Sequence, residues 1–138
     1  MDENLKARIE ESFAAQTMMQ TLGAEVASVT PGEVQITAPI LPIARQQQGF
    51  GHAALTFALG DTAAGYAALT MMEPGRDVLT AEIKINLMNP ARGALLRATG
   101  RVIKPGRRLV VVSAEVHAED ENGAETLVAL LQGTMVPV

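Results

Sequence analysis

The stretch QGFGHAALTFALGDTAAGYAALTMM, residues 48–72, decides the fold. From residue 52 onward it is apolar on nearly every side and rich in small residues, and Pro74 and Gly75 follow it. A helix that is apolar all round is enclosed by the rest of the protein rather than lying on its surface. The sequence therefore predicts a long helix over residues 52–72 with the remaining chain wrapped around it.

Strand patterns lie on both sides of this helix. Residues 25–29 and 33–38 flank Thr30-Pro31-Gly32, and a Pro-Gly pair is typical of a type II turn. Apolar and polar residues alternate over residues 78–88, which indicates a strand with one buried face. Further strands are predicted at residues 95–103, 109–118 and 126–136, separated by turn sequences at 89–93, 105–106 and 122–123. We expect the last four strands to form a meander.

The beginning of the chain has a helical pattern. Leu5, Ile9, Phe13 and Met18 roughly follow a helical spacing, which predicts one helix over residues 4–22 that ends at Gly23. The length of 138 residues fits a single domain. Short turns favour antiparallel pairing, because parallel strands need long crossovers. The sequence thus predicts a single α+β domain over residues 1–138, with a helix in residues 1–22 and about six mainly antiparallel strands around a central helix.

Composition excludes several classes of protein. The chain has no cysteine, which excludes a disulfide scaffold, a zinc ribbon and a thiol nucleophile. Its net charge of -4 argues against nucleic-acid binding. It starts with an acidic, polar segment rather than a signal peptide, and Gly60, Asp61 and Gly65 interrupt its longest apolar stretch. It contains neither a glycine-rich nucleotide motif nor a His-x-x-x-His pair. We expect a cytoplasmic protein with no metal, membrane or nucleic-acid partner.

Two residues of the central stretch can carry chemistry. Asp61 lies among apolar residues, where a buried carboxylate costs several kcal/mol unless it is paired or functional. It is either a nucleophile or general base, or the N-cap of a second helix. His52 stands at the start of the helix and either acts chemically or caps it. The backbone N–H groups of Ala53 and Ala54 are the stronger candidates there, because a helix N-terminus can stabilise a developing oxyanion.

The spacing of these residues bears on assembly. His52 and Asp61 are nine residues apart, which is ~13 Å along a helix at 1.5 Å per residue. This distance is too long for both to act on one carbon atom. If both serve one site, they come from two copies of the chain, so the sequence points to a dimer with paired sites.

Two further features have both a chemical and an ordinary reading. Thr80 can orient a water molecule or hold Asp61, or it can be a threonine that simply favours a strand. Arg107 and Arg108 follow the turn at Pro105-Gly106 and can contact phosphates, or they can be solvated hairpin charges.

Four segments occur in an order that resembles one known family. They are QGFGHAA at residues 48–54, ALGDTAAG at 58–65, TAEIKIN at 80–86 running into NPARG at 89–93, and GRRL at 106–109. The first is similar to a G-x-x-H-G-G segment, the second to A-L-A-D-x-A-x-G and the fourth to G-R-x-L. Together they resemble the hotdog-fold acyl-CoA thioesterases of the phenylacetate-pathway (PaaI-like) type, over about residues 23–138.

The resemblance implies a fold, an activity and an assembly. The fold is a hotdog, in which an antiparallel sheet wraps a long helix. The activity is hydrolysis of acyl-CoA thioesters to free acid and CoA, with coenzyme A as part of the substrate and no separate cofactor. Two subunits share each active site, and the homodimers are expected to pair into homotetramers.

The resemblance also implies a role for individual residues. Asp61 falls on the catalytic carboxylate, as nucleophile or as base toward water, and the N–H of Ala53 falls where the thioester carbonyl is polarised. Thr80 falls beside the catalytic water. The other implied site residues are Gln46, which helps to place substrate or water, the mostly structural His52, the substrate-binding Gly49, Ala54 and Asn89, and Arg107 and Arg108 near the CoA phosphates.

The chain departs from the family at two points. Gln46 stands near a family asparagine, and its longer side chain would place the amide differently. Ala53 and Ala54 stand where the family has two glycines, and an alanine would be strained if a positive φ were needed there. This difference leaves a non-catalytic hotdog module, for acyl-CoA binding or assembly, as one alternative. A hotdog hydratase or dehydratase, with His52 and Asp61 as acid and base, is another.

Overall fold

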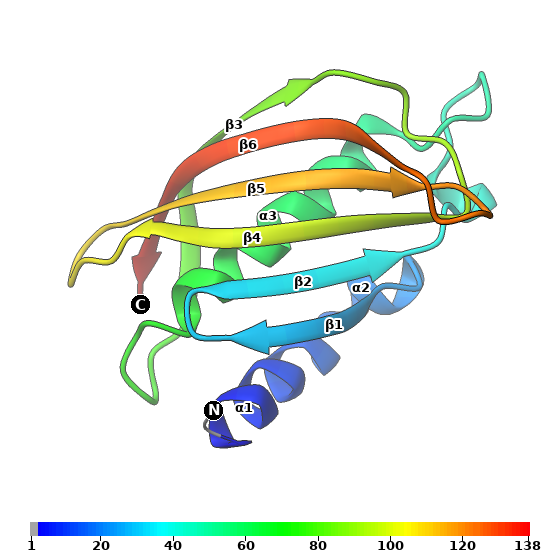
Figure 1. Ribbon diagram of the computed structural model, residues 1–138. Helices are drawn as coiled ribbons and strands as arrows, with labels where there is room; N and C mark the ends of the chain where they lie inside the picture. The colour runs from blue at the N-terminus through cyan, green and yellow to red at the C-terminus, as the bar shows by residue number, and fades with distance from the viewer. Residues whose placement is uncertain (1–2) are drawn as a thin grey trace.

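A single antiparallel sheet curves around one long helix in the computed structural model, which describes residues 3–138 (Figure 1). The helices are α1 (Glu3–Ala14), α2 (Thr17–Thr21) and α3 (Ala53–Leu69), with a short 3-10 helix at Pro42–Ala44. The strands are β1 (Glu25–Thr30), β2 (Glu33–Ala38), β3 (Val78–Leu87), β4 (Leu95–Lys104), β5 (Val110–Glu119) and β6 (Glu125–Pro137), in the sheet order β1-β2-β4-β5-β6-β3. Every neighbouring pair is antiparallel, which confirms the predicted α+β architecture.

Small residues let α3 lie directly on the sheet. A Cβ atom on Gly100 of β4 would lie 2.3 Å from the carbonyl oxygen of Ala63, so the helix and strand backbones touch there. Leu59, Ala63 and Ala67 are fully buried beneath the sheet. The predicted enclosed helix is therefore confirmed, although one side of it stays open.

The beginning of the chain forms two helices, so the prediction of one helix over residues 4–22 is wrong. Gln16 has an extended backbone (φ -83, ψ 96) and separates α1 from α2. The break changes the helical register: Met19 is 2% exposed, whereas Met18, which the single helix placed with the core residues, is 57% exposed. The kink keeps both Phe13 and Met19 in the core.

The expected meander is also wrong in one strand. β4, β5 and β6 pair in sequence, but β3 pairs with β6 at the edge of the sheet (Figure 1). The connection between β3 and β4 is long enough to skip two strands, and it passes the start of α3, where Gly51 N–H donates to Ala91 O at 2.7 Å. This path brings Asn89 to the N-terminal end of the central helix.

A β-bulge changes the faces of β3. The pairing with β6 shifts between Thr80 and Glu82, and an extra residue reverses which side chains face the core. Ile83 and Ile85 pack against the core as expected, but Leu79 lies before the bulge and is 58% exposed. The alternation therefore predicted the strand correctly and the face of its first part incorrectly.

No helix within residues 3–138 is long and apolar enough to cross a membrane.

Candidate active site

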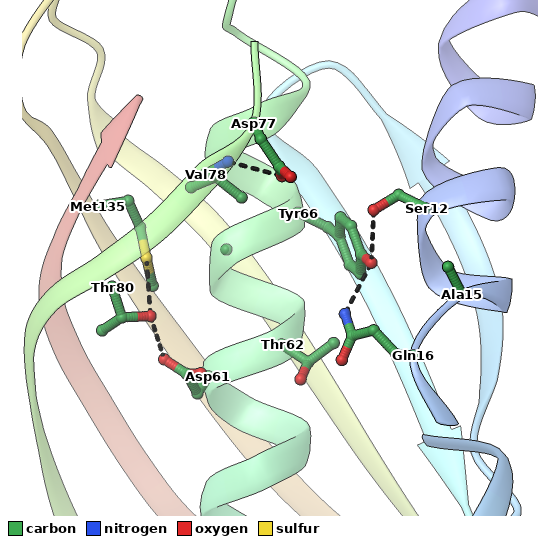
Figure 2. A pocket seen from close by; sticks show the side chains of 11 residues that line it. Ser12, Ala15, Gln16, Asp61, Thr62, Tyr66, Asp77, Val78, Thr80 and Met135 are labelled. Atoms are coloured by element: carbon green, nitrogen blue, oxygen red, sulfur yellow. Dashed lines mark hydrogen bonds between the residues drawn. The ribbon is translucent and has the colours of Figure 1, made fainter. Parts of the chain in front are cut away.

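Asp61 lies in the middle of one continuous helix. Because α3 runs unbroken from Ala53 to Leu69, Asp61 does not cap a second helix, and that reading is wrong. Its side chain is half-buried on the side of α3 that the sheet leaves open. Thr80 of β3 donates a hydrogen bond to Asp61 Oδ1 at 2.7 Å (Figure 2). The bulge turns Thr80 toward α3, and the strand therefore holds the carboxylate, as one reading of the sequence predicted.

The Asp61 carboxylate borders a cavity of about 380 Å³ between α1, α3 and the start of β3 (Figure 2). Most of its lining is polar: the lining residues include Ser12, Gln16, Thr62, Tyr66, Asp77 and Thr80. The Sδ atom of Met135, which also lines the cavity, lies 3.3 Å from Thr80 Oγ1. A half-exposed carboxylate at the edge of such a cavity can reach a bound ligand or water.

The N-terminus of α3 offers a free backbone donor. His52 caps the helix, since its Nδ1 accepts the N–H of Ala54 at 2.9 Å. The N–H of Ala53 has no acceptor within residues 3–138. No non-glycine residue in this part of the chain has a positive φ, so Ala53 is unstrained where the family has glycine. The helix therefore presents one unused donor and its positive dipole end to whatever binds there.

A second cavity, of about 500 Å³, opens at this helix end. Gln46, His52, Ala53 and Asn89 line it together. Besides the capping His52, two of these side chains have partners: Gln46 Oε1 accepts from the backbone N–H groups of Gln48 and Phe50, and Asn89 Nδ2 donates to Leu127 O at 2.8 Å. Both side chains thus shape the loops around the cavity, and their contact with substrate stays a prediction.

The remaining predicted site residues do not line either of these two cavities. Ala54 is exposed one residue beyond Ala53. Gly49 has φ +92 and supports the loop before α3, where its carbonyl accepts from Arg45 at 2.6 Å. Arg107 lines a third cavity with Arg76 beyond the other end of α3, and Arg108 is exposed beside it.

One chain therefore does not bring the candidate groups to a single point. Ala53 and Asp61 are eight residues apart on one straight element, which is roughly 12 Å of helix. The carboxylate and the free amide border different cavities.

The structure adds residues that the sequence reasoning did not single out. Thr56 lines the cavity beside Ala53, is 1% exposed, and its hydroxyl has no hydrogen-bond partner in the described part of the chain. Tyr66 contacts Ser12 and Gln16 across the cavity beside Asp61. A polar residue inside an apolar helix was a usable signal for Thr56, as it was for Asp61.

Thr56→Val is expected to raise the free energy of unfolding by about 1 kcal/mol, because valine keeps the shape and removes an unpaired buried hydroxyl. Urea unfolding measures the change. Thr99→Val is the matched control: Thr99 is also buried, but its hydroxyl accepts a hydrogen bond from Gln35 at 3.2 Å, so this change is expected to destabilise. Equal destabilisation by both changes would contradict the reading of Thr56 as unpaired.

The fold and these cavities agree with a family assignment. A model of the thioesterase superfamily matches residues 48–125, and the chain belongs to this family. It is 37% identical to a thioesterase family protein from Silicibacter pomeroyi, with a TM-score of 0.94 over 97% of this chain and 98% of that one. The PaaI protein of the phenylacetic acid degradation operon of E. coli is 20% identical, with a TM-score of 0.84 over 97% of this chain and 93% of that one. The chain is thus a member of the thioesterase superfamily with a hotdog fold.

Curated relatives extend the comparison to named activities. A putative esterase from Saccharolobus solfataricus is 35% identical over 64% of this chain, and the match spans only 55% of that relative's length. The 1,4-dihydroxy-2-naphthoyl-CoA hydrolase of Listeria monocytogenes is 26% identical over 75% of this chain and 85% of its own. Together with the family match, these names support thioester hydrolysis in general.

Proposed function

We propose that the protein hydrolyses acyl-CoA thioesters to a free acid and CoA. The observation that carries the proposal is Asp61, a carboxylate held by Thr80 at the edge of a cavity in a thioesterase-family chain. In the reaction Asp61 takes a proton from a water molecule, and the water oxygen attacks the carbonyl carbon. The C–S bond then breaks, and the sulfur leaves as the CoA thiol after it gains a proton. Direct attack by the carboxylate, followed by hydrolysis of the anhydride, uses the same geometry.

The free N–H of Ala53 supplies the second part of this chemistry. Negative charge develops on the carbonyl oxygen when the carbon is attacked, and a backbone donor at a helix N-terminus stabilises that charge. Because Ala53 has no internal acceptor within residues 3–138, the donor needs no rearrangement to serve this oxygen.

Assembly would bring the two parts together. β3 is an edge strand with one unpaired side, and the open side of α3 beside it carries Phe57, Ala58 and Asp61. Leu87 at the end of this strand is 55% exposed. We propose a homodimer in which these surfaces meet, so that Asp61 of one subunit faces the Ala53 amide of the other. Pairing of dimers into a homotetramer stays a prediction.

The CoA portion and the location of the enzyme complete the proposal. Arg107 and Arg108 would contact the phosphates of CoA, and Arg76 beside Arg107 adds a third positive charge to that surface. Action in the cytoplasm stays a prediction from the sequence.

A panel of acyl-CoA substrates, with released thiol as the readout, tests the activity. Release of CoA from at least one acyl chain supports the proposal. If calorimetry showed binding of acyl-CoA without release of CoA, the protein would be a non-catalytic binding module. This is the main alternative to hydrolysis, because Ala53 and Ala54 carry methyl groups where the family has glycines. Addition of water to an enoyl-CoA without thiol release would favour the hydratase.

Ala53→Pro is expected to lower kcat by about 100- to 1,000-fold, the effect of losing one oxyanion donor. Proline removes the N–H but fits the first position of a helix, and the extended backbone of His52 (ψ 145) accommodates it. Thiol release and a thermal unfolding curve measure activity and fold together. Ala53→Gly keeps the N–H and is the matched control. Full activity in the proline variant would show that this amide does not bind the carbonyl oxygen.

A further inference from the structure

Three polar side chains meet across the cavity that contains Asp61. Tyr66 projects from α3, and Ser12 and Gln16 reach it from α1 and the residues just after it (Figure 2). Tyr66 is 4% exposed. Its hydroxyl receives a hydrogen bond from Gln16 Nε2 at 2.7 Å and lies 3.0 Å from Ser12 Oγ.

The hydroxyls of Ser12 and Tyr66 leave one proton without an acceptor. The contact between them uses one O–H group as donor, whichever of the two donates. Gln16 is itself a donor to Tyr66 and takes up no proton from the pair. The second O–H has no acceptor within residues 3–138. Tyr66 is buried and Ser12 is partly buried, so this O–H faces the cavity from a partly desolvated position, and a ligand oxygen that accepts its proton would be stabilised there.

The charge of the cavity restricts what that oxygen can belong to. Asp61 and Asp77 both line the cavity, and no lysine, arginine or histidine is among its lining residues. A second negative charge on the ligand would therefore be repelled, whereas an uncharged oxygen would not. The lining favours a neutral hydrogen-bond acceptor.

The position of Tyr66 fits the far end of a bound acyl group. Tyr66 follows Asp61 by five residues on α3, and helix side chains tilt toward the N-terminus, so the phenol lies over the turn that carries Thr62. The carboxylate and the phenol then lie on opposite sides of one cavity (Figure 2). A volume of about 380 Å³ is near the lower end of ligand sites and suits a compact group.

We propose that this cavity binds the acyl group and that the Ser12–Tyr66 hydroxyl pair selects compact acyl groups whose far end carries an uncharged acceptor oxygen. A hydroxyl, keto or ether oxygen has this chemistry. The inference rests on the proposed function, because Asp61 in the same cavity is then the hydrolytic carboxylate.

Three acyl-CoA esters of matched length test the selection. They are hexanoyl-CoA, 6-hydroxyhexanoyl-CoA and adipoyl-CoA, compared by kcat/KM from thiol release. We expect one added neutral hydrogen bond to make kcat/KM roughly 2- to 10-fold higher for 6-hydroxyhexanoyl-CoA than for hexanoyl-CoA. The carboxylated adipoyl ester is expected to be the poorest of the three.

Two variants assign the preference to the hydroxyl pair. Tyr66→Phe and Ser12→Ala are each expected to bring the ratio of hydroxylated to plain ester close to one. Ser113→Ala, which removes a hydroxyl from β5 outside this cavity, is the matched control and keeps the wild-type ratio. A purely structural role for Tyr66, in docking α1 on α3, would lower both rates together and leave the ratio unchanged.

The outcomes separate this proposal from the function on which it rests. If the wild-type protein prefers the hydroxylated ester and both variants lose this preference, the proposed role of the Ser12–Tyr66 pair is supported. Equal rates for hexanoyl and hydroxyhexanoyl esters, or a preference that survives Tyr66→Phe, overturns it while leaving thioester hydrolysis intact. If no ester is hydrolysed, the proposed function fails, and calorimetry with the same esters decides the pocket: tighter binding of the hydroxylated ester supports it and equal binding refutes it.

Discussion

Asp61→Asn is expected to lower kcat for thioester hydrolysis by roughly 100- to 10,000-fold, the usual contribution of a general base. An amide has nearly the same shape as the carboxylate, and its oxygen can still accept the hydrogen bond from Thr80. It cannot take a proton from water or form the acyl-enzyme. Fold and substrate binding are therefore expected to survive while turnover is lost, and Asp61→Ala is expected to give the same loss.

Single-turnover thiol release, with a thermal unfolding curve for each variant, measures this effect. Glu121→Gln, which removes a carboxylate from the exposed turn before β6, is the control and is expected to keep wild-type activity. If the Asp61→Asn variant hydrolysed the thioester at the wild-type rate, Asp61 would not be the catalytic carboxylate, even though the chain belongs to the thioesterase superfamily.

Mixing two inactive variants tests whether the site is shared. In a heterodimer of an Asp61→Asn chain and an Ala53→Pro chain, one of the paired sites regains an intact Asp61 and an intact Ala53. Random exchange at equal concentrations is then expected to restore about a quarter of wild-type activity, since half of the dimers carry one intact site. A site built within one chain would give no recovery.

Gly100→Ala is expected to lower the free energy of unfolding by more than about 3 kcal/mol, at or beyond the upper end of overpacking effects. The new Cβ would lie 2.3 Å from backbone atoms of Ala63, and neither β4 nor α3 can retreat without opening the core. Urea unfolding measures the loss, with insolubility on expression as its extreme form.

Gly65→Ala is the matched control for this change. Gly65 lies inside α3, and among residues 3–138 its added Cβ would meet only Met135 Sδ at 4.0 Å, an ordinary contact. This variant is expected to be stabilised by about 0.5–1 kcal/mol, because glycine is unfavourable within a helix. If both glycine variants unfolded at the same urea concentration, the close approach of α3 to β4 at Gly100 would not be important for stability.

Local patterns predicted the elements better than their arrangement. Alternation and turn sequences predicted the strands, and the apolar run predicted α3, because these signals depend on residues close in sequence. The place of β3 beside β6 depends on which edge the chain selects after a long connection, which no local pattern encodes. The bulge at residues 80–82 and the kink at Gln16 have the same origin, since each satisfies packing against distant elements.

The candidate site shows the same division. Asp61 stood out because it is a charge within an apolar helix. The helix N-terminus and the following strand pointed to Ala53 and Thr80, and the resemblance then implied a role for each. Their chemical roles remain predictions. Tyr66 did not stand out, because a tyrosine in an apolar stretch is ordinary, and its contact with Gln16 exists only once α1 packs on α3.

The open side of α3 and the free edge of β3 have a consequence for how this protein can change. In the proposed dimer, the surface that selects a partner and the surface that carries Asp61 are one surface. A substitution at Phe57 or Leu87 would then reduce turnover without touching the substrate, and a gain in affinity between subunits would also be a gain in activity. Natural substitutions on this face would therefore be selected for their effects on turnover and on subunit affinity at the same time.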